Sequence, residues 1–374
     1  VVILCGFESR CPHHRNFSLL KSGFEFSVTQ TLRTLDDLVA GGLVTDGARA
    51  ALEPVAERYA IAVTPTMDAL IKRDDPSDPI RLQFIPDPRE VIVAKNEVDD
   101  PIGDFAHSPL EGLVHRYPDR VLVKLTHICP VYCRFCFRRE MVGPGKSEAL
   151  SEKNLELIYA YIEAHPEIWE VIVTGGDPLI LSPRRLEAFT SRLAKIDHVK
   201  VLRWHTRVPS VDPSLVSEEL SRALVAEGKS VWLALHVNHP RELTAECSLA
   251  LARLKHAGLN LISQSVLLKG VNDSVETLAA LMRGFVEAGV KPYYLHQGDL
   301  APGTSHFRTS VKDAKALIDG LRGRLSGLAQ PVYVIDLPGG AGKVPVAALS
   351  CEIDGEGWRI RDWQGYTHHY PPKE

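Results

Sequence analysis

From residue 121 onward, short runs rich in apolar and β-branched residues alternate with longer stretches in which apolar residues recur every three or four positions. The runs predict strands at Val121–Thr126, Glu170–Thr174, Lys200–Thr206, Ser230–His236, Leu259–Val266 and Lys291–Gln297. The stretches between them predict helices at Glu152–Ala164, Arg184–Ile196, Pro213–Ala226, Pro240–Ala257 and Ser274–Ala288. Strands joined through helices imply right-handed crossovers and a parallel sheet. We therefore expect an α/β fold with a partial (β/α)6 barrel.

The first 110 residues follow a different pattern. Apolar periodicity predicts helices at Thr29–Ala40 and Asp46–Tyr59, and stretches rich in Pro and Asp follow at Asp74–Pro79 and Phe84–Arg89. We expect a helical N-terminal region over residues 1–110, the barrel over 111–346 and a short C-terminal extension over 347–374. In barrels of this kind the chemistry gathers at the carboxyl ends of the strands, so polar motifs at those ends are the first candidates for function.

The overall composition excludes some classes of protein. Hydrophobic residues make up 45% of the 374 residues and charged residues 24%, as in an ordinary globular protein with a sizeable core. A net charge of −4 gives no electrostatic reason to expect nucleic acid or an anionic membrane as a partner. No apolar stretch approaches the ~20 residues of a membrane span, and the opening run Val1–Gly6 is too short for a signal-peptide core. We therefore expect a cytoplasmic location.

The most specific chemical signal is a triplet of cysteines, Cys129, Cys133 and Cys136, directly after the first predicted strand. A C-x3-C-x2-C spacing can place three thiolates around one face of a four-iron cluster and leave the fourth iron without a protein ligand. Two alternatives are a zinc ion with a distant fourth ligand and cysteines that are close by chance. Zinc sites usually add a second couple of ligands, and none follows here. The spacing therefore favours an iron–sulfur cluster with an open iron.

The other cysteines carry weaker signals. Cys5 and Cys11 lie near a His-His pair and could form a second metal site, but free cysteines in a poorly ordered terminus are the better interpretation. Cys247 and Cys351 fit small apolar residues on a helix and a strand. The odd total of seven cysteines fits a reducing compartment.

The segment Thr126–Arg139 resembles the radical S-adenosylmethionine (SAM) enzymes in its cysteine spacing, in the strand before it and in the aromatic and arginine residues after it. The resemblance implies a [4Fe-4S] cluster on the three cysteines and SAM chelated by the open iron. It also implies a partial barrel of six strands, in agreement with the periodicity. An electron donor such as flavodoxin or ferredoxin is the expected partner.

Three further positions fit a SAM site. The glycines Gly175 and Gly176 allow a close approach of backbone to ligand, and Asp177 can accept hydrogen bonds from an ammonium. Alone, this turn would more often be a plain strand-to-helix connection with a helix cap. His236 and Gln264 end the fourth and fifth predicted strands, and the resemblance implies that they contact SAM.

Lys343 follows a Gly-rich turn, from which its amine can reach into a pocket and form a Schiff base with pyridoxal phosphate (PLP). A nucleotide-binding loop and a simple exposed turn are the alternatives. A Walker loop needs a hydroxyl residue directly after the lysine, and Val344 occupies that position, so phosphate–magnesium binding fits poorly.

Four segments together resemble the lysine 2,3-aminomutase family: Cys129–Arg139, Gly175–Leu179, Tyr293–Arg308 and Asp336–Lys343. The similarity extends from about Pro109 to Val346. It implies Lys343 as the PLP lysine, with Arg116, Tyr117 and Arg120 near that cofactor. It also implies that Arg138 binds the substrate carboxylate, and that Asp299 and Asp336 receive the distal ammonium of the substrate.

The expected activity is therefore the conversion of L-lysine to β-lysine. Two carboxylates around one buried ammonium favour lysine over glutamate, although taken singly each Asp would more often be a cap or loop residue. Arginine also fits as a substrate. A shorter relative that makes β-lysine for modification of elongation factor P is the nearest rival, and a non-catalytic iron–sulfur or zinc-binding protein is the rival of another class.

One departure from the family concerns a structural zinc ion. Tetrameric members hold zinc between subunits with cysteines outside the barrel, and the corresponding position after the fifth strand here is Ser274. Only Cys351 is available in the C-terminal region. The sequence therefore gives no support for this zinc or for a tetramer built on it, and it leaves open whether the chain forms a homo-oligomer.

Overall fold

The computed structural model describes residues 30–143, 145, 149–346, 351–354, 357–361, 364 and 366–370. Cys5, Cys11 and the neighbouring histidines lie outside these residues. The described strands form a large sheet in which neighbours in space are also neighbours in sequence, ordered from β1 to β9. A second sheet of three antiparallel strands, β10 to β12, lies near the C-terminus.

The large sheet curves into a partial barrel. Its strands are β1 (Leu113–Tyr117), β2 (Arg120–Thr126), β3 (Glu170–Gly175), β4 (Val201–Thr206), β5 (Ser230–His236), β6 (Asn260–Val266), β7 (Lys291–His296), β8 (Val332–Leu337) and β9 (Gly342–Pro345). Strands β2 to β8 run parallel, whereas β1 and β9 pair antiparallel at the two edges. The small sheet consists of β10 (Cys351–Asp354), β11 (Gly357–Arg361) and β12 (Thr367–Tyr370).

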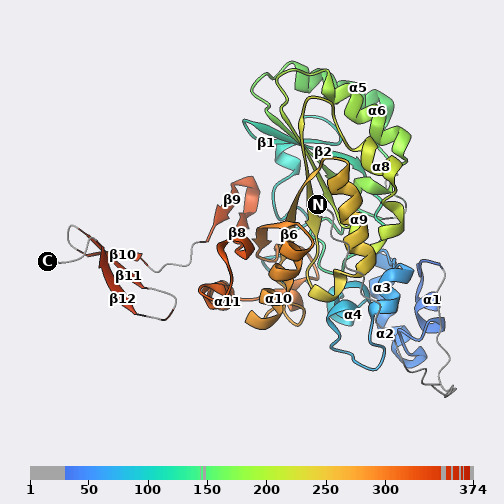
Figure 1. Ribbon diagram of the computed structural model, residues 1–374. Helices are drawn as coiled ribbons and strands as arrows, with labels where there is room; N and C mark the ends of the chain where they lie inside the picture. The colour runs from blue at the N-terminus through green and yellow to red at the C-terminus, as the bar shows by residue number, and fades with distance from the viewer. Residues whose placement is uncertain are drawn as a thin grey trace, which may run out of the picture.

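All six predicted strands are confirmed, as β2 to β7. The prediction missed β8, which adds a further parallel strand to the expected six. This strand is as long as β3, β4 and β7, but it runs directly into the Gly-rich turn before β9, and its sequence is interpreted as part of the segment that contains that turn. Together β8 and β9 form a hairpin at the edge of the barrel, at left centre in Figure 1.

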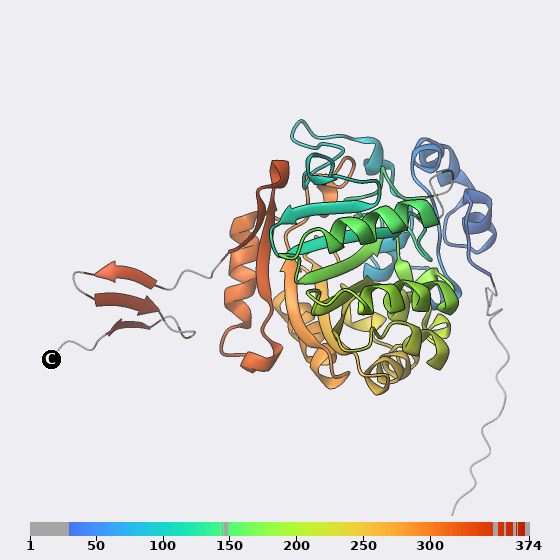
Figure 2. The ribbon, with the colours of Figure 1, turned by 90° about the horizontal axis from the view of Figure 1, so that it is seen from above.

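Helices cover the outer face of the curved sheet (Figure 2). They are α5 (Glu152–Glu163), α6 (Pro183–Ala194), α7 (Val208–Val211), α8 (Glu218–Ala223), α9 (Ala245–His256), α10 (Val275–Glu287) and α11 (Val311–Leu321). The predicted helix Pro213–Ala226 is only a short turn followed by α8, because Ser217 caps a new start by accepting a hydrogen bond from the Leu220 amide. Ser274 likewise caps α10 by accepting from the Thr277 amide.

Side chains alternate between the two faces of each barrel strand, as the period of two requires. On β4, Leu202 and Trp204 are buried in the core between sheet and helices. The alternate residues Arg203 and His205 lie on the other face of this strand and line a cavity inside the barrel. The barrel therefore has an apolar outer layer that stabilises the fold and a polar inner face that is available for chemistry.

The described part of the N-terminal region contains α1 (Leu35–Ala40), α2 (Arg49–Arg58), α3 (Pro65–Leu70) and α4 (Pro79–Phe84). These blue helices gather at one end of the molecule in Figure 1. Leu38, Val63 and Phe84 from this region share one hydrophobic cluster with Val131, from the cysteine segment, and Val211 of α7. The region is therefore packed onto the part of the barrel that carries the cysteines. No helix in the described ranges is long and apolar enough to cross a membrane.

Candidate active site

One cavity of about 580 Å³ inside the barrel brings the predicted site residues together. Its lining includes Cys129, Cys133, Cys136, Arg138, Arg116, Tyr117, Arg120, Gly175, Gly176, Asp177, His236, Gln264, Asp299, Asp336 and Lys343. These residues are far apart in sequence, but most follow or end strands whose carboxyl ends share one edge of the sheet. Their shared location agrees with the sequence analysis, and the individual roles assigned to them remain predictions.

The cysteine segment after β2 is anchored by a buried carboxylate from the N-terminal region. Arg134 Nη2 donates to Glu90 Oε2 at 2.6 Å, and Arg139 pairs with the same oxygen. Burial by itself would raise the pKa of Glu90, but the two guanidinium groups hold it below its ordinary value. Because Arg134 and Arg139 bracket Cys136, this ionised carboxylate holds the segment against the N-terminal helices.

The three cysteines are free thiols, not disulfide partners. Burial raises the pKa of Cys129 well above its usual value and that of Cys136 to about 11. In the described ranges, no three His, Cys, Asp or Glu side chains are placed to hold one metal ion. In an iron–sulfur cluster each cysteine binds a different iron, so the sulfurs need not converge on one point. Three free thiols on one segment at the cavity wall therefore suit the ligand set of a four-iron cluster.

The turn Gly175–Asp177 packs directly against the start of the cysteine segment. The amide of Gly176 donates to the Thr126 carbonyl at 2.6 Å, and that of Asp177 donates to the Ile128 carbonyl at 2.9 Å. Gly175 has a φ of 128°, and a Cβ at Gly176 would overlap the Ile128 backbone. These glycines therefore allow a close approach between two parts of the backbone.

Asp177 acts as a helix cap, the alternative considered for it. Its Oδ1 accepts hydrogen bonds from the Leu179 amide at 3.1 Å and from the Thr206 hydroxyl at 2.7 Å. Its Oδ2 accepts from the Arg207 amide at 2.7 Å. The carboxylate thus already binds three groups of the protein and ties the end of β3 to the end of β4, and its contact with SAM stays a prediction.

His236 and Gln264 are direct partners in the register of β5 and β6. Burial and the nearby Arg207 hold the pKa of His236 well below its ordinary value, so its imidazole is neutral at pH 7. The ring packs near Phe135, with 5.7 Å between centroids, and its buried Nε2 has no hydrogen-bond partner among the described residues. A polar atom left in this state beside the cysteines fits contact with a bound ligand.

Lys343 lines the same cavity as the cysteines and lies on β9, the last strand in the order of the large sheet. Its backbone amide donates to the Tyr117 hydroxyl at 2.8 Å, and the Arg120 guanidinium lies 3.7 Å from the centre of the Tyr117 ring. Its Nζ donates to Asp336 Oδ1 at 2.5 Å. The two residues are direct partners in the β8–β9 ladder, which accounts for this pairing.

Asp336 and Asp299 have opposite pKa shifts although both are buried. Burial alone would raise the pKa of Asp336, but hydrogen bonds and charge from His296 and Lys343 hold it below the ordinary range. His296 Nδ1 lies 3.2 Å from Asp336 Oδ2. For Asp299, burial and the charge of Asp336 raise the pKa to about 7. The site therefore contains one carboxylate in a direct ion pair and a second, Asp299, that has no direct ion pair within the described ranges.

Asp104 is a site residue that the sequence analysis missed. Arg138 Nη2 donates to Asp104 Oδ2, and Arg116 Nη2 donates to Asp104 Oδ1, both at 3.0 Å. Asp104 lies between Pro- and Asp-rich turns without any spacing that would single it out. Its neighbour Gly103, with a φ of 70°, packs so tightly on the Gly-rich turn that an added Cβ would overlap the Gly340 nitrogen.

Comparison with known proteins shows the family to which the chain belongs. Residues 123–282 match the Radical SAM superfamily. The chain is 38% identical over 323 residues to the L-lysine 2,3-aminomutase of Acetoanaerobium sticklandii, covering 86% of this chain and 78% of that protein. It is 37% identical to the L-lysine 2,3-aminomutase of Bacillus subtilis, covering 93% and 74%. It is 32% identical to the glutamate 2,3-aminomutase of Clostridioides difficile, covering 92% and 81%.

These similarities span the cysteine segment, the barrel and the Lys343 turn. The Radical SAM match accounts for the open iron–sulfur ligand set and the SAM cofactor, and it requires a reductant. The matches indicate an enzyme and not the alternative of a non-catalytic iron–sulfur or zinc-binding protein. On this basis, the chain belongs to the lysine 2,3-aminomutase family of radical SAM enzymes and is an isomerase of that type.

Proposed function

We propose that this enzyme moves the α-amino group of L-lysine to the β-carbon, with PLP attached through Lys343. The observation that carries the substrate assignment is the contact between Lys343 Nζ and Asp336 Oδ1 at 2.5 Å. It places a lysine ammonium on a buried carboxylate inside the cavity, next to a second buried carboxylate, Asp299. A pocket that holds the ammonium of its own lysine is chemically suited to the distal ammonium of a lysine substrate.

The charges at this end of the cavity discriminate between substrates. Glutamate would bring a third carboxylate beside Asp299 and Asp336, and like charges in a desolvated site repel strongly. Lysine brings a cation, and its binding favours the ionised form of Asp299. Arginine is the second candidate because its guanidinium can also meet two carboxylates. A role in supplying β-lysine for elongation factor P would use the same site.

The opposite end of the substrate is assigned to Arg138. Arg138 is buried, and its guanidinium is paired with Asp104. A planar guanidinium can keep Asp104 on one edge and present its remaining N–H donors to a second carboxylate. With its carboxylate on Arg138 and its distal ammonium on the aspartates, an amino acid would be held at both ends, with its reacting carbons between them.

The residues around Lys343 suit PLP. Arg116 and Arg120 supply cations for its phosphate, and Tyr117 holds the backbone of Lys343 through its hydroxyl. PLP supplies an aldehyde for the amine and a conjugated ring that spreads unpaired spin, while SAM and the reduced cluster supply the radical that removes a hydrogen atom. The protein itself orients the substrate and excludes water from the enclosed cavity. A small redox protein such as flavodoxin or ferredoxin is the proposed electron donor.

Anaerobic reconstitution tests the proposal directly. The chain is loaded with iron, sulfide and PLP, supplied with SAM and a reductant, and given lysine, arginine or glutamate separately. Chromatography is expected to show β-lysine from lysine and little product from the other two. Preferential turnover of glutamate or arginine would contradict the substrate assignment. Adding the translation factor and its ligase to the lysine assay separates the two biological roles.

A cysteine variant provides the control for radical chemistry. Cys133→Ala removes one of three proposed cluster ligands, so we expect loss of iron and of SAM cleavage while PLP still binds Lys343. SAM cleavage at the parental rate by an iron-free variant would contradict the proposed mechanism.

A further inference from the structure

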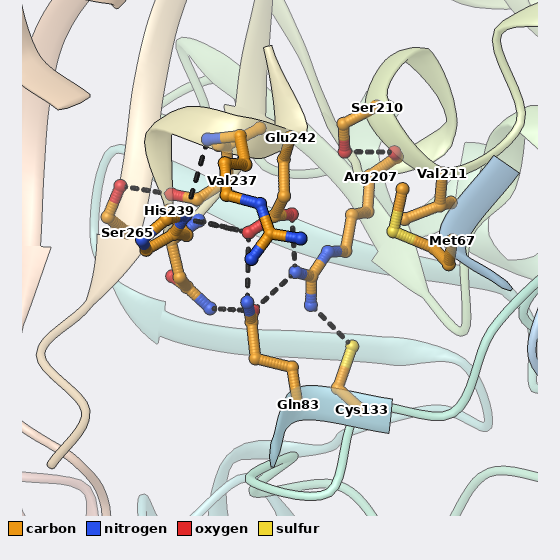
Figure 3. Close-up of polar contacts among 12 residues, drawn as sticks. Met67, Gln83, Cys133, Arg207, Ser210, Val211, Val237, His239, Glu242 and Ser265 are labelled. Atoms are coloured by element: carbon orange, nitrogen blue, oxygen red, sulfur yellow. Dashed lines mark hydrogen bonds and ion pairs between the residues drawn. The ribbon is translucent and has the colours of Figure 1, made fainter. Parts of the chain in front are cut away.

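Arg207, the residue directly after β4, contacts Cys133, one of the three proposed cluster ligands. Its Nη1 donates a hydrogen bond to Cys133 Sγ at 2.9 Å (Figure 3). The guanidinium carbon lies 4.7 Å from the centre of the Phe84 ring and 5.6 Å from that of Phe135. A permanently charged group is thus enclosed between aromatic rings and a sulfur atom.

The second terminal nitrogen of the guanidinium, Nη2, is held by two acceptors that are fully buried. Arg207 Nη2 donates to Gln83 Oε1 and to Glu242 Oε2, each at 2.6 Å. Glu242 is itself fixed, because its Oε1 accepts from the amides of Asn238 at 3.1 Å and His239 at 2.9 Å. Figure 3 shows these contacts converging on Arg207 from three segments of the chain.

This network determines where the fork of Arg207 points. Because a guanidinium is planar and rigid, fixing Nη2 on Gln83 and Glu242 also fixes the direction of Nη1 toward Cys133. The backbone of Arg207 is fixed as well, since its amide donates to Asp177 Oδ2 at 2.7 Å. The hydrogen bond to sulfur is therefore a built feature of the fold, supported by residues from α4 and from the turns after β3 and β5.

We infer that Arg207 is a positioning residue that raises the reduction potential of the cluster bound at Cys133, and that Glu242 moderates this effect. The inference rests on the proposed function, because it needs a cluster on the three cysteines. Reduction adds one electron from an external low-potential donor, and therefore one negative charge, to the cluster. A cation hydrogen-bonded to a ligand sulfur stabilises that added charge, and burial strengthens the interaction.

The signs of the two charges give the inference a sharp test. Glu242 lies on the far side of Arg207 from Cys133, so its negative charge opposes the effect of the cation. Weakening the Arg207 contact and neutralising Glu242 should therefore move the potential in opposite directions. If the ion pair between Arg207 and Glu242 were only structural, the two substitutions would not shift the reduction potential in opposite directions.

The experiment uses the full chain reconstituted with iron and sulfide, without SAM, and measures the cluster potential by a redox titration followed by electron paramagnetic resonance. Arg207→Lys keeps the charge but loses the fork, and we expect the ratio of reduced to oxidised cluster at a fixed ambient potential to fall about tenfold, a shift of about −59 mV for a one-electron couple. Glu242→Gln should shift the potential upward. Arg134→Lys is the matched control, because Arg134 is equally buried and pairs with Glu90.

The outcomes separate the inference from the function on which it rests. Failure of the parent chain to bind four irons with a visible absorption band would contradict the proposed cluster. With the cluster present, the inference is overturned if Arg207→Lys and Glu242→Gln leave the potential unchanged, or if both shift it the same way. It is also overturned if Arg134→Lys shifts the potential as much as Arg207→Lys. If Arg207→Lys loses iron, the Glu242→Gln titration alone decides, because an upward shift is required.

Discussion

Lys343 and Asp336 face each other across the β8–β9 hairpin, with the ammonium of one 2.5 Å from the carboxylate of the other. The sequence analysis assigned these residues to different tasks, cofactor attachment and substrate binding. In the structure they share one contact. A Schiff base between PLP and Lys343, as proposed above, would convert Nζ to an imine nitrogen and replace the primary ammonium that contacts Asp336. Attachment of the cofactor would thereby open Asp336 to the ammonium of a substrate.

Lys343→Ala should abolish the borohydride-reducible PLP adduct, because the attacking amine is removed. Lys124 provides a matched control. Unlike the more exposed Lys343, Lys124 is buried, and burial and the charge of Arg138 lower its pKa, a property that favours Schiff-base lysines. Lys124→Met should retain the adduct. The adduct is detected by mass spectrometry of the reduced protein. Its survival in Lys343→Ala and its loss in Lys124→Met would contradict the assignment of Lys343.

Asp336→Asn should lower kcat/KM for lysine, because one charge of a desolvated ion pair is removed. The fall should correspond to a loss of about 2–5 kcal/mol of transition-state stabilisation. Iron content should stay at the parental level, which distinguishes this effect from damage to the cluster. Combining the change with Asp299→Asn should cost less than the sum of the single variants, since both carboxylates act on the same ammonium. Parental turnover by either single variant would contradict the assignment of that carboxylate.

The pH dependence of lysine use should report Asp299, whose pKa is raised to about 7 by burial and by Asp336. Below pH 7 this carboxyl is protonated and cannot pair with the substrate ammonium. Lysine kcat/KM is therefore expected to rise by up to about tenfold per pH unit below 7 and to level off above it. In Asp299→Asn the rise near pH 7 should be absent. A step of the same size in that variant would assign the titration to another group.

The tight packing of Gly103 on the Lys343 turn predicts a selective effect of Gly103→Ala. The new Cβ would overlap the Gly340 backbone, so the turn must shift and PLP attachment should weaken. Gly228→Ala is the matched control, because Gly228 has a similar φ of 73° but open space around it. Both variants should lose about 1–2 kcal/mol of stability from left-handed backbone strain, measured by denaturant unfolding. Only Gly103→Ala should also lose the adduct.

Local patterns in the sequence were sufficient to predict six of the parallel barrel strands, β2 to β7, and the cysteine segment. Strand and helix periodicities depend on a few neighbouring residues, so β2 to β7 could be recognised directly. Cys129, Cys133 and Cys136 lie on one short segment, and their spacing alone restricts the geometry of their thiols. Lys343 could be proposed as a candidate for a similar reason, because its Gly-rich turn is continuous in the chain, and its role stays a prediction.

Tertiary structure alone decided which charges meet in the interior. The hydrogen bond from Arg207 to Cys133 and the pairing of Arg138 with Asp104 join residues that are far apart in sequence. Such contacts depend on how the N-terminal region packs onto the carboxyl ends of the strands, and no local periodicity records that packing. The occupation of Asp336 by Lys343 likewise depends on the register of β8 and β9. Buried charges require partners, but the physical need for a partner does not reveal which distant residue the fold will supply.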